Sequence, residues 1–181
     1  MTFDFSNANQ AVSEAVPESE STQKPESSTN SADDIEPKDV PGVIDLGFWM
    51  HQESVYRHFN YDPNKCGRMV YHFMTNPDTH FAYVGTLNGA LNSVLLGSIG
   101  EHYFGTDLIA SDTLWYVSPQ SRGSRVGLQL LRAFEKWAKE RDAAEIYMGI
   151  SSGLSADKTG AMLQKLGYDV VGGNYKQRVV Q

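Results

Sequence analysis

The chain has 181 residues and a net charge of −7, which is enough length for one ordinary domain, and its one cysteine, Cys66, excludes an internal disulfide. No apolar run approaches the roughly 20 residues of a membrane-spanning helix, and the start of the chain lacks the lysines and apolar run of a secretory signal. We therefore expect a protein of a reducing, cytoplasmic compartment.

Residues 1–40 are acidic and rich in Ser, Glu, Asn and Pro. They hold nine acidic residues and two lysines, which is the whole net charge of −7, so residues 41–181 are formally neutral. We expect a disordered acidic tail over 1–40 and one domain over 41–181, because scattered apolar residues such as Ile35 cannot offset the entropy of ordering. The tail is either a solubilising or tethering segment or a docking peptide that uses Phe3 and Phe5. A neutral domain gives no strong signal for nucleic acid.

Two helices are expected before the first strand. Asp45 can cap the first, and Asp62-Pro63 is typical of the start of the second. Apolar residues recur at near-helical spacing in both, at Phe48, Trp49, Val55 and Phe59 and then at Met69, Val70, Phe73 and Met74. Histidines also lie in this region, but they lack cysteines or carboxylates at metal-ligand spacing, so we expect no metal site.

Three antiparallel strands are expected next. Residues 80–84, 90–99 and 108–117 are β-like, and Leu87-Asn88-Gly89 predicts a hairpin turn between the first two. Since consecutive strands with short connections are usually neighbours, the three should form a meander.

The second half alternates helices and strands. Residues 124–140 have one apolar and one basic face and predict an amphipathic helix, and 143–150 follow it as a strand of a parallel crossover would. A short helix is expected over 156–166, with final strands over 168–171 and 175–180. This order predicts an α/β (α+β) fold: a mixed, mostly antiparallel sheet of about six to seven strands with helices on both faces.

A candidate anion site lies between Trp115 and Leu131. An apolar strand stops at Pro119, a small polar loop follows, and an amphipathic helix begins. The first N–H groups of a helix have no internal partners, and the helix dipole adds about half a positive charge there. The arrangement favours a bound phosphate.

The same stretch carries the pattern Val117-x-Pro119-x-x-Arg122-Gly123-x-x-x-Gly127-x-x-Leu130-Leu131, and Lys165-Leu166-Gly167-Tyr168 follows later. The first pattern resembles the acetyl-coenzyme A loop of the GNAT acyltransferase superfamily, V-x-P-x-x-R-G-x-G-x-G-x-x-L-L, and the second resembles its E-K-L-G-F signature. The predicted order of elements is also the order of that family. The chain is further similar to small acetyltransferase-like proteins seen in bacteriophage genomes.

This resemblance implies an N-acetyltransferase that moves an acetyl group from acetyl-coenzyme A to a primary amine by direct attack. The loop N–H groups would bind the pyrophosphate, the preceding strand would pair with the pantetheine arm, and an N–H near Val117 would polarise the thioester carbonyl. The cofactor-binding residues implied are Trp115, Tyr116, Val117, Arg122, Gly123, Ser124, Arg125, Val126, Gly127 and Leu128.

Two positions depart from the family pattern. Arg125 replaces the second loop glycine, and it either contacts a phosphate directly or marks a loop that no longer binds the cofactor. Leu163 stands where many members place the tyrosine that protonates the departing thiolate. Tyr168 or Tyr175 is the candidate substitute, although each is also an ordinary strand or core aromatic.

The resemblance also implies a carboxylate base on the strand before the loop. Asp112 is the first candidate, with Glu101 beside His102 as the second; a purely structural role for Asp112 is the alternative. A second hypothesis therefore keeps the fold without the chemistry: a weak or inactive, virion-associated protein that binds a phage or host protein through its tail and surface. The amine acceptor cannot be read from the sequence, and a homodimer is left open.

Overall fold

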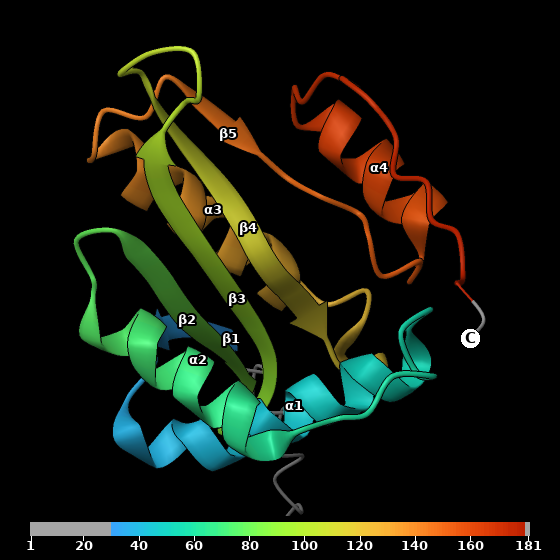
Figure 1. Ribbon diagram of the computed structural model, residues 1–181. Coiled ribbons are helices and arrows are strands. Elements are labelled where there is room, and N and C mark those ends of the chain that lie inside the picture. Colours follow the sequence, from blue (N-terminus) through green and yellow to red (C-terminus); the bar gives the residue numbers. More distant parts are fainter. Residues whose placement is uncertain (1–29, 180–181) are drawn as a thin grey trace, which may run out of the picture.

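A five-stranded mixed sheet of order β1-β2-β3-β4-β5 carries the fold in the computed structural model, which describes residues 30–179 (Figure 1). All neighbouring strands are antiparallel except β4 and β5, which are parallel. The strands are β1 Asn30–Asp34, β2 His80–Leu87, β3 Ala90–Glu101, β4 Leu108–Val117 and β5 Glu145–Tyr147. The helices are α1 Val40–Glu53, α2 Pro63–Thr75, α3 Val126–Lys139 and α4 Ala156–Lys165, with short 3-10 helices η1 Pro37–Asp39 and η2 Pro119–Ser121.

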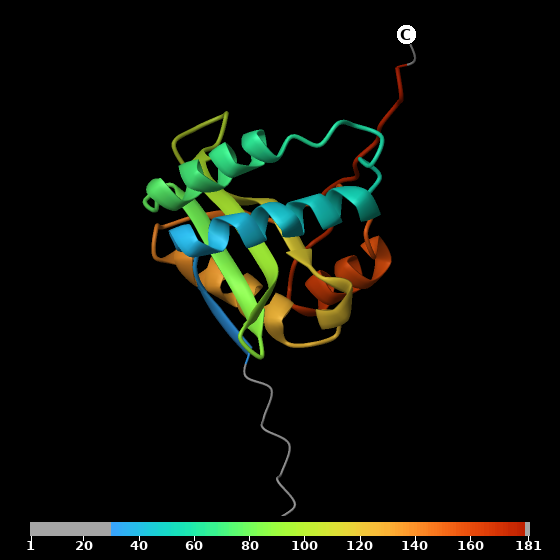
Figure 2. The same ribbon diagram turned by 90° about the horizontal axis from the view of Figure 1, so that it is seen from below.

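The sheet is the middle layer of the molecule. Figure 2 shows α1 and α2 on one face and α3 on the other, as the sequence predicts. Side chains alternate along β3, so that Val94 and Leu96 pack toward α1 and α2 while Leu95 packs toward α3, and all three are fully buried. A central strand covered on both faces explains the continuous apolar run that the sequence shows there.

The helix predicted over 124–140 is confirmed as α3. Its buried stripe includes Leu130, Phe134 and Ala138, which recur every four residues and face the sheet. No helix within residues 30–179 is long and apolar enough to cross a membrane.

Gly97 on β3 lets α3 approach the sheet closely. A Cβ atom at Gly97 would lie 2.5 Å from Cε2 of Phe134 and 3.0 Å from the carbonyl oxygen of Ser111. We expect Gly97→Ala to lower the free energy of unfolding by about 2 kcal/mol, the usual cost of overpacking a filled core. Gly100→Ala is the matched control, because a Cβ atom there meets nothing within 4 Å. Urea denaturation compares the two, and equal midpoints would contradict this packing.

β1 corrects one expectation. The composition of residues 1–40 predicts a disordered tail, yet Asn30–Asp34 pairs with β2, and Ile35 directly after it is buried in the core. β1 contains no β-branched or aromatic residue, so strand propensity gives no sign of it; its pairing comes from β2 and from the burial of Ile35. Residues 1–29, with Phe3 and Phe5, lie outside the described part of the chain.

The first helix also differs from the prediction. Asp45 does not cap it, because α1 begins at Val40 and Asp45 lies inside the helix. Pro41 occupies the first turn, where a proline costs no hydrogen bond, so the helix extends further upstream than the cap signal suggested. Val55 and Phe59 follow the end of α1 and belong to the connection before α2.

Two turn predictions are confirmed. The carboxylate of Asp62 accepts hydrogen bonds from the N–H groups of Asn64 and Lys65 and so caps α2. The hairpin between β2 and β3 turns at Asn88 and Gly89, both with positive φ, as expected of an Asn-Gly turn.

The C-terminal part has fewer strands than predicted. β5 covers three residues of the predicted strand 143–150, and residues 168–179 contain no strand, so five strands replace the expected six to seven. Residues 180–181 lie outside the described chain. The β-branched residues of this segment favour a strand only where a neighbouring strand pairs with them, and the three-residue β5 offers a short edge.

Candidate active site

β4 and β5 separate after three residue pairs, at Ile109, Ala110 and Ser111. Beyond Ser111, no strand of the described chain pairs with the outer edge of β4 as far as Val117. This open edge of β4, residues 112–117, is roughly 20 Å long. It is the kind of surface on which an extended ligand can add as a further strand.

The backbone of β4 presents hydrogen-bonding groups along this open edge. The N–H group of Ser118 donates to the carbonyl of Asn92 on the β3 side, at 2.8 Å. Because backbone directions alternate along an antiparallel strand, Trp115 and Val117 turn their N–H and C=O groups to the open edge. Tyr116 turns its backbone groups toward β3, so its predicted cofactor contact cannot come from there.

Asp112 lies where the two strands separate. Its Oδ1 atom accepts a hydrogen bond of 2.6 Å from the N–H group of Gly149, on the segment that follows β5. A β-bulge leaves the adjacent Thr113 unpaired, since Leu96 of β3 faces Leu114 and Gly97 faces Asp112. Burial raises the pKa of the Asp112 carboxyl, and the N–H groups of Gly149 and of Asp112 itself offset this only in part.

Several N–H groups of the loop between β4 and α3 have no acceptor within the described part of the chain. Gly123 adopts φ +87°, a conformation that favours glycine, and turns the chain into α3. The N–H groups of Ser121, Arg122 and Ser124 bond to carbonyls of the loop, and that of Val126 donates to Ser124 Oγ. Within residues 30–179, no acceptor is found for the N–H groups of Gly123, Arg125, Gly127 and Leu128. We call these four N–H groups, together with the dipole of α3, the anion cradle.

The anion cradle and the open edge of β4 are in contact. A Cβ atom at Gly127 would lie 3.1 Å from Cγ2 of Val117 and 3.8 Å from Cζ2 of Trp115, so α3 begins directly against the end of β4. The indole Nε1 of Trp115 is buried there without a partner in the described chain. A ligand with an anionic group and an extended arm can therefore occupy both surfaces at once.

Arg122 is bound differently from the expectation. Its Nε donates to the carbonyl of Val117 at 3.0 Å, and its Nη2 contacts Glu53 Oε2 at 2.6 Å. The hydroxyl of Tyr116 donates to the other oxygen of Glu53, also at 2.6 Å. Glu53 ends α1, far away in sequence, and no local pattern marks it, so sequence reasoning missed it. The side chain of Arg125 makes no hydrogen bond or ion pair within residues 30–179 and is exposed.

The remaining predicted catalytic residues are dispersed. Tyr168 donates its hydroxyl proton to Glu135 Oε1 at 3.1 Å, and burial together with the charge of Glu135 raises the pKa of the tyrosine. Leu163 is buried in the core, which accounts for an apolar residue there. Glu101 pairs with Leu108 at the opposite end of β4 from the loop, roughly 30 Å along the strand, so the structure does not bring it to the cradle.

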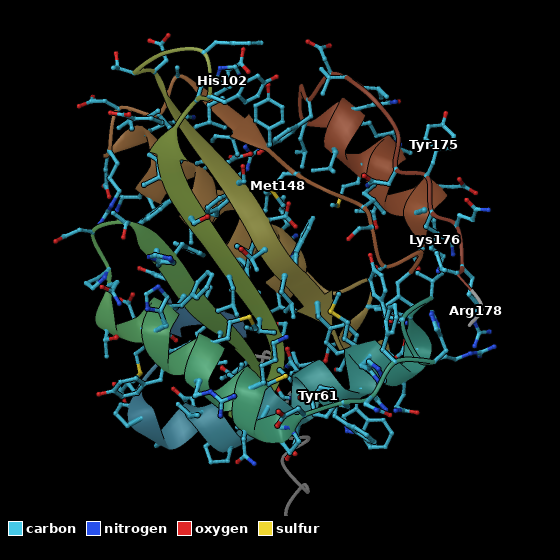
Figure 3. The ribbon with its side chains drawn as sticks, viewed as in Figure 1. Tyr61, His102, Met148, Tyr175, Lys176 and Arg178 are labelled. Atoms are coloured by element: carbon cyan, nitrogen blue, oxygen red, sulfur yellow. The ribbon has the colours of Figure 1, made fainter. Side chains whose placement is uncertain are left out.

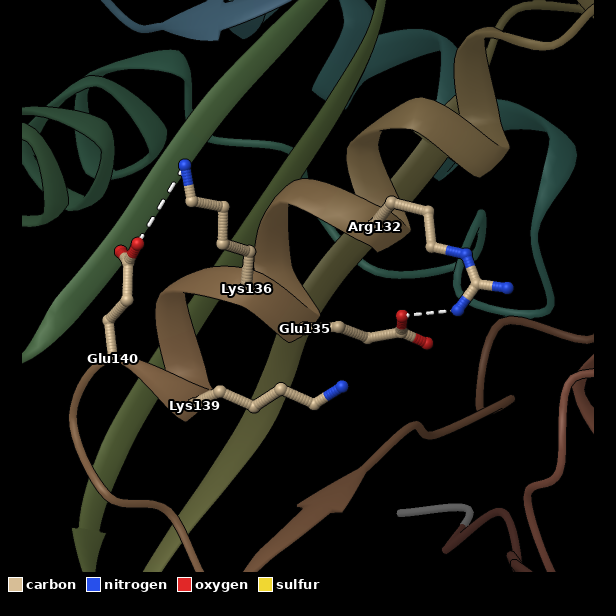
Figure 4. Close-up of a pocket in the computed structure, with 5 residues that line it drawn as sticks. All are labelled: Arg132, Glu135, Lys136, Lys139 and Glu140. Carbon is tan, nitrogen blue, oxygen red and sulfur yellow. Dashed lines mark hydrogen bonds and ion pairs between the residues drawn. The ribbon is translucent and has the colours of Figure 1, made fainter.

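Glu135 also borders a hollow of about 520 Å³ on α3 (Figure 4), lined by Arg132, Glu135, Lys136, Lys139 and Glu140. Arg132 pairs with Glu135 at 2.6 Å and Lys136 with Glu140 at 3.7 Å, so most of its charge is compensated. It lies on the second half of α3, away from the N-terminus of that helix, and is separate from the anion cradle.

The connection between α1 and α2 closes over the segment that follows β5. The N–H of Val55 donates to the carbonyl of Ser152 at 3.0 Å, and the hydroxyl of Tyr56 donates to that of Ser151 at 2.9 Å. Figure 3 shows Lys176 and Arg178 beside this connection, and Lys176 Nζ donates to the Val55 carbonyl at 3.1 Å.

The fold places the N-terminus of α3, with four N–H groups that have no acceptor within residues 30–179, beside an unpaired strand edge. The chain belongs to the acetyltransferase (GNAT) family, whose model matches residues 47–168. Comparison with curated protein sequences finds no match.

Solved structures of low sequence identity share the fold. Glucosamine-6-phosphate N-acetyltransferase from Arabidopsis thaliana is 14% identical, with a TM-score of 0.65 over 83% of this chain and 98% of that chain. The aminoglycoside N-acetyltransferase AAC(6')-Iy in complex with CoA is 14% identical, with a TM-score of 0.68 over 86% and 98%. A transcriptional regulator from Bacillus halodurans C-125 is 13% identical, with a TM-score of 0.68 over 83% and 100%.

Proposed function

We propose that this protein is a cytoplasmic N-acetyltransferase that transfers an acetyl group from acetyl-coenzyme A to a primary amine. The observation that carries the proposal is the anion cradle placed directly at the end of the open edge of β4. Pyrophosphate and an extended pantetheine arm are the two parts of coenzyme A that these surfaces suit. Membership of the family and the likeness to an acetyltransferase in complex with CoA support the same ligand.

In this proposal the four cradle N–H groups bind the pyrophosphate, and the pantetheine arm pairs with the backbone of Trp115 and with the N–H group of Val117, whose carbonyl is held by Arg122. The acetyl group then lies toward Asp112, at the bulge where β4 and β5 separate. Asp112 takes a proton from the acceptor ammonium, and the neutral amine attacks the thioester carbonyl carbon. An N–H group of the open edge stabilises the tetrahedral oxyanion, whose collapse breaks the C–S bond. As the amide forms, the attacking nitrogen loses its remaining extra proton to solvent, and the leaving thiolate takes up a proton, for which Tyr168 is the candidate donor. Asp112 and Tyr168 return to their starting protonation states through solvent, so one proton is released overall.

A second candidate function is a partner-binding protein on the same fold, of phage or host association. One observation favours it: Leu163 has no proton to donate, and the hydroxyl of Tyr168 donates to Glu135, so Tyr168 would have to leave this hydrogen bond before it could protonate a thiolate. The exposed aromatic side chains of Tyr103 and Phe104 on the β3–β4 connection, with residues 1–29, are the surfaces it would use. Capture of a stable partner that is lost on deleting residues 1–29 would support this function.

Amine-dependent release of free coenzyme A tests the first function. The full chain is incubated with acetyl-coenzyme A and a panel of small primary amines and peptide N-termini, and the free thiol and the acetylated amine are both measured. We expect equal amounts of the two products with at least one amine. Thiol release without an acetylated amine, or no release with any amine, would favour the second function.

A further inference from the structure

Glu53 joins three elements at the cofactor loop. It ends α1, receives the hydroxyl of Tyr116 from β4, and pairs with the guanidinium of Arg122 from the loop, with both contacts at 2.6 Å. The same guanidinium donates through Nε to the carbonyl of Val117, the last residue of β4. Arg122 is thereby fixed at two points, and its position decides where the chain enters Gly123.

This cluster differs from an ordinary surface ion pair. The side chains of Glu53 and Arg122 are 27% and 36% exposed, and each makes two charge-assisted hydrogen bonds. Burial raises the pKa of Glu53, but the hydrogen bonds from Tyr116 and Arg122 and the charge of Arg122 outweigh it and lower the pKa below its usual range. Glu53 is therefore ionised at neutral pH and keeps Arg122 in place.

We propose that Glu53 is a positioning residue for acetyl-coenzyme A: it holds Arg122 against Val117 and so keeps the four N–H groups of the anion cradle aimed at the pyrophosphate. This inference rests on the proposed function. A loop already held in its binding conformation loses less conformational entropy when the ligand binds. Glu53 acts from α1, on the face of the sheet opposite to α3, and its hydrogen bonds go to Tyr116 and Arg122, not to the N–H groups of the cradle.

A consequence concerns Arg122. Its guanidinium is occupied by Glu53 and Val117, so it supports the loop instead of contacting a phosphate. Arg125 is then the arginine of the loop that remains for a direct contact with the ligand. Glu53→Ala and Arg122→Ala should each loosen the same cradle. The double variant should therefore bind acetyl-coenzyme A with the same affinity as the single variant that binds less tightly.

The test measures acetyl-coenzyme A affinity by calorimetry and KM for S-acetylpantetheine, which lacks the phosphates. We expect Glu53→Ala to raise the Kd for acetyl-coenzyme A about fivefold to tenfold, because the loop is then less preorganised before the ligand binds. The KM for S-acetylpantetheine should stay unchanged, since that donor does not use the cradle; a merely unfolded variant would lose both. Glu140→Ala is the matched control, because it removes an exposed carboxylate paired with Lys136 on α3.

Hydrogen exchange of the peptide over residues 118–128, measured without ligand, gives a second readout. It should be faster in Glu53→Ala and unchanged in Glu140→Ala. Wild-type affinity in Glu53→Ala, tighter binding, or a double variant whose losses simply add would overturn the role of Glu53. If the wild-type chain itself binds no acetyl-coenzyme A, the proposed function fails as well, and that result is distinct because it appears before any substitution.

Discussion

Replacing Arg125 by glutamate is expected to weaken acetyl-coenzyme A binding about a hundredfold while the chain stays folded, because a charge-assisted contact is lost and a repulsive charge is added. Arg125 is exposed and directly precedes α3, next to the anion cradle. A carboxylate at the N-terminus of a helix is favourable for the helix itself. The variant therefore separates binding from stability, which should be unchanged or slightly higher.

Lys139→Glu provides the matched control for this prediction. It changes the charge of the same helix by the same amount, at the end of α3 that lies roughly 20 Å from the cradle. Calorimetry should show wild-type affinity for Lys139→Glu and a large loss for Arg125→Glu. An equal loss of affinity in the two variants would mean that only the overall charge matters. Wild-type affinity in both would show that the phosphate does not bind at this loop.

The second large effect is expected at Asp112. Asp112→Asn should lower kcat by about 10²- to 10⁴-fold, the usual contribution of a general base, and leave the Kd for acetyl-coenzyme A unchanged. Asparagine retains an oxygen that can accept the hydrogen bond from Gly149, so the junction of β4 and the segment after β5 should keep its shape. Glu101→Gln is the control, because it removes a carboxylate at the far end of the strand pair. Similar rates for wild type and Asp112→Asn would assign Asp112 a structural role.

The pH dependence of stability tests the same carboxyl independently. Burial raises the pKa of Asp112 in the folded chain above its usual value, so the folded state holds this proton more tightly than the unfolded state. The contribution is favourable at low pH and is lost as pH rises through the folded pKa. Asp112→Asn cannot ionise, so relative to wild type it should gain stability across that interval. Parallel stability curves would show that the carboxyl is not desolvated.

The parts of the fold that the sequence predicts correctly depend on local signals. The Asn88-Gly89 turn, the Asp62 cap and the apolar stripe of α3 each depend on residues within one or two turns of each other. The loop before α3 is predictable for the same reason, since a strand, a polar turn and a helix follow one another directly. A helix N-terminus is an anion site whatever the rest of the chain does.

The parts that the sequence does not reveal depend on contacts between distant residues. β1 is polar, and it forms because its backbone pairs with the edge of β2 and because Ile35 is buried in the core. Glu53 becomes part of the site only when α1 ends beside Arg122, which lies 69 residues later. The strands predicted over 168–171 and 175–180 fail for the converse reason: suitable residues are present, but no neighbouring strand pairs with them in residues 168–179.

Titration of the full chain with acetyl-coenzyme A by calorimetry tests the central claim most directly. The anion cradle and the open edge of β4 predict saturable binding of one ligand per chain in the micromolar range, with S-acetylpantetheine much weaker because it lacks the phosphates. The anion cradle also predicts that salt weakens the binding of acetyl-coenzyme A, since part of the affinity is electrostatic. No saturable heat at millimolar acetyl-coenzyme A, or equal affinity for the two donors, would contradict the account.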